Sequence, residues 1–324
     1  MFITRLDEMP RIGDIFDMVT NMERGHEDIP MTRDVFRKFA VPTAYSPEGF
    51  VSCGRQFGFP ADFVASIYRG DEKTRVGADP MLAHDILMNR FNAVAASKDG
   101  VPTARLWNGL CYGVVSPSYN ECDDPEVFGP VMECDILKDL AVSRYSVTPC
   151  YTTVQMVFPE PFKVPGDDSA LYWGINISNS MTGLASVIFN LYVWRQVCSN
   201  GLCIPARNAR FVRRVHRGTK DIAAELYENI QFLAARKDDI TRELITAADA
   251  DARILAMKEE NRIPFLARQL SVGEKEVQRI LDLFNDTYGG RTQWGFAQAI
   301  SEYARDLPNL QKRDALERRA LLVA

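Results

Sequence analysis

Residues 171–196 read LYWGINISNSMTGLASVIFNLYVWRQ, and this stretch decides the fold. Two runs of mainly apolar and aromatic residues flank a short segment, Asn179 to Gly183, that is rich in small and polar residues. In the first run, Leu, Trp and Ile side chains alternate with Tyr, Gly, Asn and Ser side chains. Alternation with period two is typical of a β-strand, because successive side chains point to opposite faces of a sheet. The stretch therefore predicts two antiparallel strands joined by a turn.

The segments before this hairpin extend it into a sheet. Residues 151–158, YTTVQMVF, alternate in the same way, and PGDD at 165–168 supplies residues typical of a turn. A further strand-like run covers Ala104 to Ser116. We therefore expect a small antiparallel sheet over about residues 104–200, with one apolar face. The second face mixes aromatic, amide and hydroxyl groups, and the sequence leaves open whether a helix covers it or solvent does.

Helical patterns flank the predicted sheet, so the expected fold class is α+β. Residues 1–102 form a helical and loop-rich region, residues 103–217 form the sheet core, and residues 218–324 form a helical region. The last region begins with apolar residues at spacings of three and four from Ile222 to Ile254, which predicts a long helix. Such a helix packs on the sheet, and its heptad-like spacing also suits contact with a neighbouring subunit.

The composition is that of a globular protein and excludes several classes. The chain has 324 residues, of which 46% are hydrophobic and 25% are charged, and its formal net charge is −5. Acidic residues interrupt the N-terminal segment where a signal peptide needs an apolar run, and no stretch resembles the roughly 20 apolar residues of a membrane helix. We expect a cytoplasmic protein of a bacterial host cell that does not bind membranes.

The chain offers little chemistry for a metal, a cofactor or catalysis. The odd number of cysteines, seven, includes no CxxC pair, so neither a disulfide framework nor a zinc site is expected. No phosphate-binding loop or GxSxG motif occurs, and the paired acids such as Asp123-Asp124 and Asp167-Asp168 suit solvated turns. A nucleophilic Cys198 or Cys203 with His216 is the weaker alternative. We therefore expect a non-enzymatic protein without metal or cofactor.

Charge gives the clearest functional signal. Residues 169–220 contain no Asp or Glu, and their formal charge is +7 against −5 for the whole chain. The cations of this window are Arg195, Arg207, Arg210, Arg213, Arg214, Arg217 and Lys220. A long segment without acids and rich in arginine is typical of a surface that binds phosphates.

Nucleic acid is the partner that fits this pattern best. The residues expected to contact phosphates are Arg207, Arg210, Arg213, Arg214, His216, Arg217 and Lys220. The residues expected to stack on bases are Tyr172, Tyr192 and Trp194, from the mixed face of the predicted sheet. The alternative is a protein-interaction factor, for example a host-defence inhibitor or an assembly scaffold, that docks an acidic partner on residues 207–220.

Five short segments, in this order, resemble one family. They are GVVSPSYNECDDPEVFGPV, ISNSMTGLASV, WRQVCSNGL, VHRG and TQWGFAQAISEYA. Together they resemble the phage- and plasmid-like proteins of domain-of-unknown-function family 932, over roughly residues 45–310. The resemblance implies a gene of phages, plasmids and integrative elements, and no established activity. The main residues that match the family motifs are Asn179, Ser180, Gly183, Arg195, Cys198, Asn200 and Gly201.

Local chemistry suggests modest roles for these motif residues. Asn200-Gly201 is a standard turn signal, and Asn179 and Gly183 bracket the hairpin loop. Arg195 lies at a strand end and is expected to pair with a carboxylate, for which Glu302 is the candidate.

The predicted order of elements, three strands followed by a long helix, is similar to the core of single-strand annealing recombinases of the phage Beta and RecT type. That similarity implies rings or filaments that hold single-stranded DNA along a basic groove. The sequence thus predicts a homo-oligomeric nucleic-acid-binding protein of a mobile element that acts in DNA replication or recombination. Single-stranded DNA is the favoured ligand.

Overall fold

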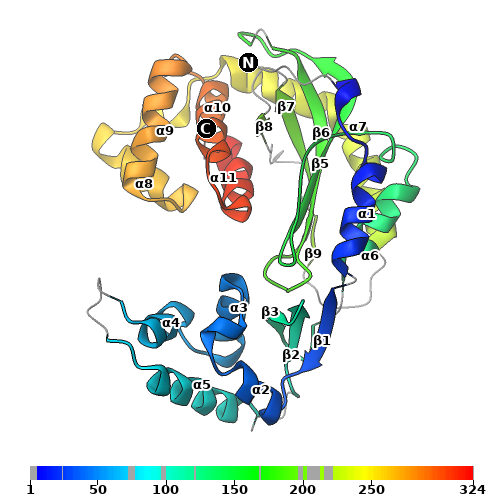
Figure 1. Cartoon of the computed structure of the whole chain (residues 1–324). Coiled ribbons are helices and arrows are strands. Elements are labelled where there is room, and N and C mark those ends of the chain that lie inside the picture. The colour runs from blue at the N-terminus through cyan, green and yellow to red at the C-terminus, as the bar shows by residue number, and fades with distance from the viewer. Residues whose placement is uncertain are drawn as a thin grey trace.

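The computed structural model describes residues 6–23, 25–71, 77–95, 100–119, 122–167, 169–195, 200–202, 212–214 and 222–323. These residues form an α+β fold with two antiparallel sheets, one of three strands and one of six (Figure 1). Each sheet has its own helices, and we call the two parts the small unit and the large unit. In the described part of the chain, no helix combines the length and the apolar character needed to cross a membrane.

The small unit packs helices against the three-stranded sheet. Its strands are β1 (His26–Pro30), β2 (Thr103–Trp107) and β3 (Leu110–Val115), in the order β1–β2–β3. Its helices are α2 (Arg33–Phe39), η2 (Pro42–Ala44), α3 (Pro47–Phe57), α4 (Ala61–Arg69) and α5 (Pro80–Ala95). Phe36 is at the centre of the core, with ring centroids 5.0 Å from Phe57 and 4.5 Å from Phe91. Aromatic pairs at these distances favour a compact core.

The predicted boundary after residue 102 is wrong. The strand-like run from Ala104 to Ser116 forms β2 and β3, but β2 pairs with β1, which comes from the region predicted to be helical. His26 lies opposite Trp107 in this register. The strand β1 is short and reads HEDIP, so periodicity alone does not reveal it. The expected single sheet over residues 104–200 is therefore two sheets.

The large unit contains the strands that the sequence predicted. Its sheet is made of β4 (Ala141–Val147), β5 (Thr152–Phe162), β6 (Leu171–Asn179), β7 (Val187–Arg195) and β8 (Asn200–Leu202), in that order, with β9 (Val212–Arg214) also paired to β7. The strands β5, β6 and β7 confirm the three runs of alternating residues. The prediction missed β4, β8 and β9.

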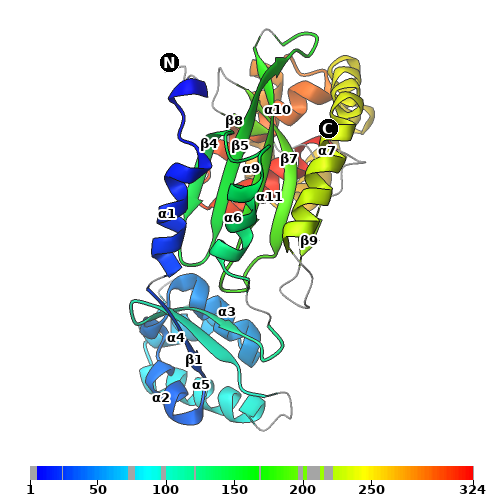
Figure 2. The same cartoon turned by 90° about the vertical axis from the view of Figure 1, so that its right-hand side faces the viewer.

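Helices lie on both sides of the large sheet. They are η1 (Leu6–Glu8), α1 (Ile12–Glu23), α6 (Asp124–Glu133), α7 (Ile222–Asp249), η3 (Arg253–Ala256), α8 (Glu259–Leu270), α9 (Glu274–Thr287), α10 (Gln293–Arg305) and α11 (Leu310–Val323). Figure 2 shows α1, α6 and α7 side by side across one face of the sheet. In Figure 1 the helices α8 to α11 lie on the opposite side of the sheet.

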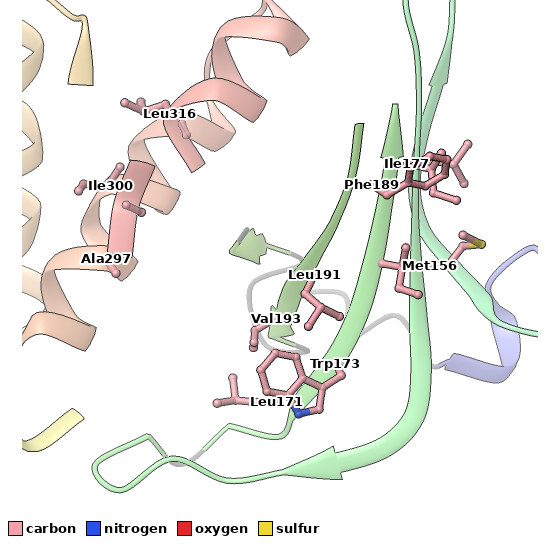
Figure 3. Packing of buried hydrophobic residues seen from close by; sticks show 14 of the residues in the cluster. Met156, Leu171, Trp173, Ile177, Phe189, Leu191, Val193, Ala297, Ile300 and Leu316 are labelled. Atoms are coloured by element: carbon pink, nitrogen blue, oxygen red, sulfur yellow. The ribbon is translucent and has the colours of Figure 1, made fainter. Parts of the chain in front are cut away.

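The apolar face of the sheet faces α1, α6 and α7. Its residues belong to one buried cluster that also includes residues of α10 and α11, and Figure 3 labels members from both groups. Trp173 on this face is 1% exposed and donates a hydrogen bond from its indole nitrogen to the Thr241 hydroxyl of α7, at 3.2 Å. The predicted long helix therefore packs on the sheet. It ends at Asp249, short of Ile254, which lies in η3.

Candidate nucleic-acid interface

The described part of the basic segment is an edge strand of the large sheet. Arg213 and Arg214 lie in β9, which pairs antiparallel with β7 and places Arg213 opposite Ile188 and Arg214 opposite Val187. The other predicted phosphate contacts, Arg207, Arg210, His216, Arg217 and Lys220, lie outside the described residues. The strand β8 pairs with the far end of the same edge of β7. The described part of the basic segment, β9, thus belongs to the large sheet beside β7.

The window without acids corresponds to one side of the large sheet. The strands β6, β7, β8 and β9 all lie within residues 169–220, and each pairs only with another of these strands or with β5. These four of the six strands therefore carry no carboxylate of their own. The strands that pair with one another beside β9 therefore add no negative charge that would weaken the attraction of phosphates.

Arg195 is paired inside the protein. Its Nη2 lies 2.9 Å from Asp167 Oδ1 and its Nε donates to the Ser169 hydroxyl at 2.9 Å. The Trp294 indole of α10 donates to the other oxygen of Asp167 at 3.2 Å. The predicted pairing of Arg195 with Glu302 is wrong, because the nearer Asp167 takes that place. Arg195 thus ties the end of β7 to α10 through Asp167, and its charge is neutralised locally.

The Asp167 carboxylate is stabilised in its charged form. Burial raises the pKa of Asp167, but the hydrogen bond from the Ser169 backbone and the positive charge of Arg195 outweigh burial and leave the pKa below its ordinary value. The expectation that Asp167 lies in a solvated turn is wrong, since its side chain is only 4% exposed.

The three rings predicted to stack on bases are buried. Tyr172 is 9% exposed, Tyr192 0% and Trp194 2%, and they share a small apolar cluster with Met9 of the N-terminal segment. The Tyr192 hydroxyl also lies 2.6 Å from the hydroxyl of Ser143. The stacking prediction is wrong for these residues, because alternation identifies the face of a strand but not what covers that face.

The polar groups of the same face are buried as well. Thr153 donates to Asn176 at 3.0 Å and Asn176 donates to Asn190 at 3.2 Å, which links β5, β6 and β7 side chain to side chain. Among the described residues, Gln155 Nε2 and Ser178 Oγ are buried without a hydrogen-bond partner. Of the two alternatives that the sequence left open for this face, the structure shows the covered one.

Hydrogen bonds to several neighbouring segments hold the turn after β6 in place. Asn179 donates from Nδ2 to Asp124 Oδ1 at 2.8 Å and to the Cys122 carbonyl at 2.9 Å. The Ser180 hydroxyl donates to the Cys150 carbonyl at 2.7 Å, and Gly183 has a positive φ of 68°, which favours glycine. These motif residues therefore hold neighbouring loops together.

The remaining motif residues follow β7. Asn200 and Gly201 are the first two residues of β8 and pair with Arg195 and Trp194, so the predicted turn at these two residues is wrong. Cys198 lies outside the described residues.

A buried arginine that the sequence analysis missed joins the two units. Arg105 of β2 is 1% exposed and donates two hydrogen bonds to Asp123, at 2.7 and 2.8 Å. Its Nε donates to Asp28 and to His26 of β1, at 3.0 Å each. A further hydrogen bond joins its Nη1 to the Met181 carbonyl in the turn after β6. The guanidinium therefore contacts the small unit, the start of α6 and the turn of the large sheet.

The charges in this cluster stabilise one another. Burial by itself lowers the pKa of Arg105, but the hydrogen bonds and charge of Asp123 outweigh burial and leave the pKa above its ordinary value. Burial raises the pKa of Asp28, and the hydrogen bond from His26 with the charge of Arg105 brings it below its ordinary value. The signal in the sequence was a single arginine within the otherwise uncharged run TARLWNGLCYGVV.

Asp124, next to this cluster, is also buried, so the expectation of a solvated turn is wrong here too. It is 1% exposed and accepts hydrogen bonds from Asn179 and Thr152. Burial raises its pKa to about 6, although those two hydrogen bonds lower the pKa in part. Asp124 is thus a carboxyl group that titrates well above the usual range.

The described cysteines have the character of core residues. Burial raises the pKa of Cys53, Cys111 and Cys150 to about 12, so these thiols stay protonated and weakly nucleophilic at neutral pH. Cys198, Cys203 and His216, the weaker catalytic alternative, lie outside the described residues. Within the part of the chain that is described, no group of three or more His, Cys, Asp or Glu side chains is arranged to hold a metal ion.

Comparison of the chain with protein-family models, with curated proteins and with solved structures finds no match. The resemblance to family 932 and the similarity in element order to annealing recombinases therefore stay predictions from the sequence.

Proposed function

We propose that the chain binds nucleic acid through phosphate contacts of its basic segment, residues 207–220, as a non-enzymatic protein of a phage or other mobile element. The observation that carries the proposal is the set of four strands β6–β9, which has no acidic residue and includes the basic edge strand β9. Phosphate contacts supply most of the affinity of proteins that bind nucleic acid without sequence preference. A role in DNA replication or recombination in the bacterial cytoplasm is the setting that fits this proposal.

The buried rings change what the proposal requires. Because Tyr172, Tyr192 and Trp194 are covered, base stacking on β6 and β7 contributes nothing in this conformation. Because Asp167 neutralises Arg195, the phosphate contacts come from the six cations of residues 207–220. Single-stranded DNA remains the favoured ligand on the similarity in element order alone.

The test is the fluorescence anisotropy of a labelled 40-mer, as single strand and as duplex, titrated with the protein at several salt concentrations. The Arg213→Glu/Arg214→Glu variant should weaken binding at least tenfold, since it replaces two cations by two anions at the edge of the sheet. Arg268→Glu/Lys275→Glu makes the same charge change on exposed positions of α8 and α9 and should retain most of the affinity. Equal affinity of the first variant and the wild type would overturn the proposal.

The acidity of the chain as a whole supports a second candidate. With a net charge of −5 and an isoelectric point near 5.4, the chain is less basic than most proteins that bind nucleic acid. The same basic segment would then dock an acidic protein. A pull-down from nuclease-treated host lysate distinguishes the two, because a protein partner survives the nuclease and nucleic acid does not.

A further inference from the structure

The small unit contains a pocket of about 420 Å³ that the proposed phosphate contacts do not use. It lies among η2, α3 and α4, and Leu184 of the turn between β6 and β7 adds to its lining. Its lining residues are all in the described part of the chain. Pockets of about 300 to 1,000 Å³ are the usual size for small-molecule sites, and such sites often lie where two parts of a protein meet.

The inner part of the pocket is aromatic. Tyr45 and Phe50, which are 6% and 5% exposed, have ring centroids 5.4 Å apart, and Tyr68 of α4 adds a third ring to the lining. Aromatic side chains bind flat rings by stacking or by edge-to-face contact. This part of the pocket therefore suits a planar, aromatic group.

The rim of the pocket carries charges of both signs. Arg55 and Arg69 lie in the last turns of α3 and α4, and Glu48 and Asp62 lie in the first turns of the same helices. All four side chains are exposed, and none of them makes an ion pair with any described residue. Arginines bind phosphate oxygens, whereas carboxylates accept hydrogen bonds from amino and hydroxyl groups.

We infer that this pocket binds a nucleotide, with the base against the aromatic lining and the phosphate toward Arg55 and Arg69. A nucleotide combines a planar ring, hydrogen-bond donors and a negative charge, and these are the three features that the lining complements. The nucleotide is either free or part of a strand. The second case rests on the proposed function, because the pocket would then hold one base of a strand whose backbone contacts the basic segment.

Two measurements distinguish a free nucleotide from a nucleotide within a strand. The first is calorimetric titration of the full chain with dAMP and with dTMP. The second compares the anisotropy of a labelled single-stranded 40-mer with that of an abasic 40-mer, which keeps the phosphates and lacks the bases. Both are repeated with Tyr68→Ala, which removes a ring from the lining, and with Leu184→Trp, which narrows the pocket from the large unit.

The matched control is Phe63→Ala, because Phe63 lies on the same helix as Tyr68, is 53% exposed and does not line the pocket. Thermal melting shows whether each variant is folded. If Tyr68→Ala is unfolded, Arg55→Ala/Arg69→Ala at exposed positions takes its place, with Arg33→Ala on α2 as its control.

A free nucleotide that binds the wild type and the control, and binds the pocket variants at least fivefold more weakly, supports the inference. If the wild type binds the 40-mer with bases more tightly than the abasic 40-mer, and the pocket variants lose this preference, the inference is supported for a nucleotide within a strand. The inference is overturned if the pocket variants change neither measurement. If the 40-mer binds no form of the protein, the proposed function fails, and the dAMP and dTMP titrations alone decide on the pocket.

Discussion

The buried carboxyl group of Asp124 couples proton binding to folding. Its pKa is raised to about 6 in the folded protein, and that of an unfolded aspartate is about 3.9. Between these two values the folded state binds more protons than the unfolded state. The stability that comes from the protonated form is therefore fully present below about pH 4 and is lost as the pH rises through 6.

The side chain of the variant Asp124→Asn stays neutral. Its free energy of unfolding should therefore rise relative to that of the wild type as the pH rises from 4 to 7. A pKa difference of two units corresponds to a relative gain of about 3 kcal/mol in the free energy of unfolding. Urea unfolding of both proteins at several pH values measures this difference. Asp135→Asn, at an exposed carboxylate, is the control and should show no such rise between pH 5 and 7. A difference between Asp124→Asn and the wild type that does not change with pH would contradict the argument.

Removal of the buried guanidinium of Arg105 should lower the free energy of unfolding. Arg105→Ala leaves the carboxylates of Asp28 and Asp123 without their main partner, and breaking a buried ion pair in this way costs about 3–5 kcal/mol. Arg37→Ala removes an arginine whose side chain is 56% exposed and 3.6 Å from Asp34, and it should cost less than about 1 kcal/mol. Urea unfolding compares the two variants, and equal losses would show that the Arg105 cluster stabilises the protein no more than a surface pair.

At the scale of one element, β6 depends on a glycine at its centre. A Cβ atom at Gly174 would lie 2.3 Å from the Tyr192 ring and 2.6 Å from the Met156 carbonyl oxygen, and both of these atoms are buried. Gly174→Ala should therefore lower the free energy of unfolding by about 1–3 kcal/mol or more. Gly129→Ala in α6, where a Cβ meets no atom within 4 Å, should be neutral or stabilising by up to about 1 kcal/mol. Thermal and urea unfolding check both, and a tolerated Gly174→Ala would mean that the Tyr192 ring can move.

The sequence predicted the elements whose signal is local. The strands β5, β6 and β7 each alternate over eight or more residues, and α7 repeats its apolar residues over several turns. The strands β8 and β9 have three residues each, which is too short for a period to be seen, and their existence depends on pairing with β7. The strand β1 forms because β2 offers an edge from far along the chain.

The candidate site was predicted less well, for a related reason. Alternation correctly placed Tyr172, Tyr192 and Trp194 on the face opposite to Trp173. It did not show that the N-terminal segment covers these rings, since that contact joins distant parts of the chain. The same holds for Arg105, because the acids around it come from β1 and from the start of α6. Local charge, by contrast, can be counted in the sequence, and so the basic segment was found.

At the scale of the whole molecule, the two units meet where the turn after β6 contacts β2 and β3. Arg105 binds the Met181 carbonyl of that turn, and a Cβ at Gly113 of β3 would lie 2.5 Å from Thr182. Leu184 of the same turn lines the pocket of the small unit. One short loop of the large sheet thus takes part both in the junction of the units and in the lining of the nucleotide site that we infer.

The salt dependence of binding tests how many cations of the basic segment act together. For a single strand, the logarithm of the association constant falls with the logarithm of the salt concentration by about 0.7 for each phosphate contacted. Contacts by all six Lys and Arg residues of the segment should therefore give a slope of about −4 for the wild type. Arg213→Ala/Arg214→Ala, which removes the two cations of β9, should make the slope shallower by about 1.4.

Anisotropy titrations of the labelled 40-mer at four or more salt concentrations give both slopes. Arg268→Ala/Lys275→Ala on α8 and α9 should leave the slope of the wild type unchanged, because these positions lie outside the basic segment. If the slope of the β9 variant equals that of the wild type, the two arginines do not contact phosphates. A wild-type slope near zero would mean that the strand is held by contacts other than charge, and the proposed phosphate contacts of the basic segment would then be contradicted.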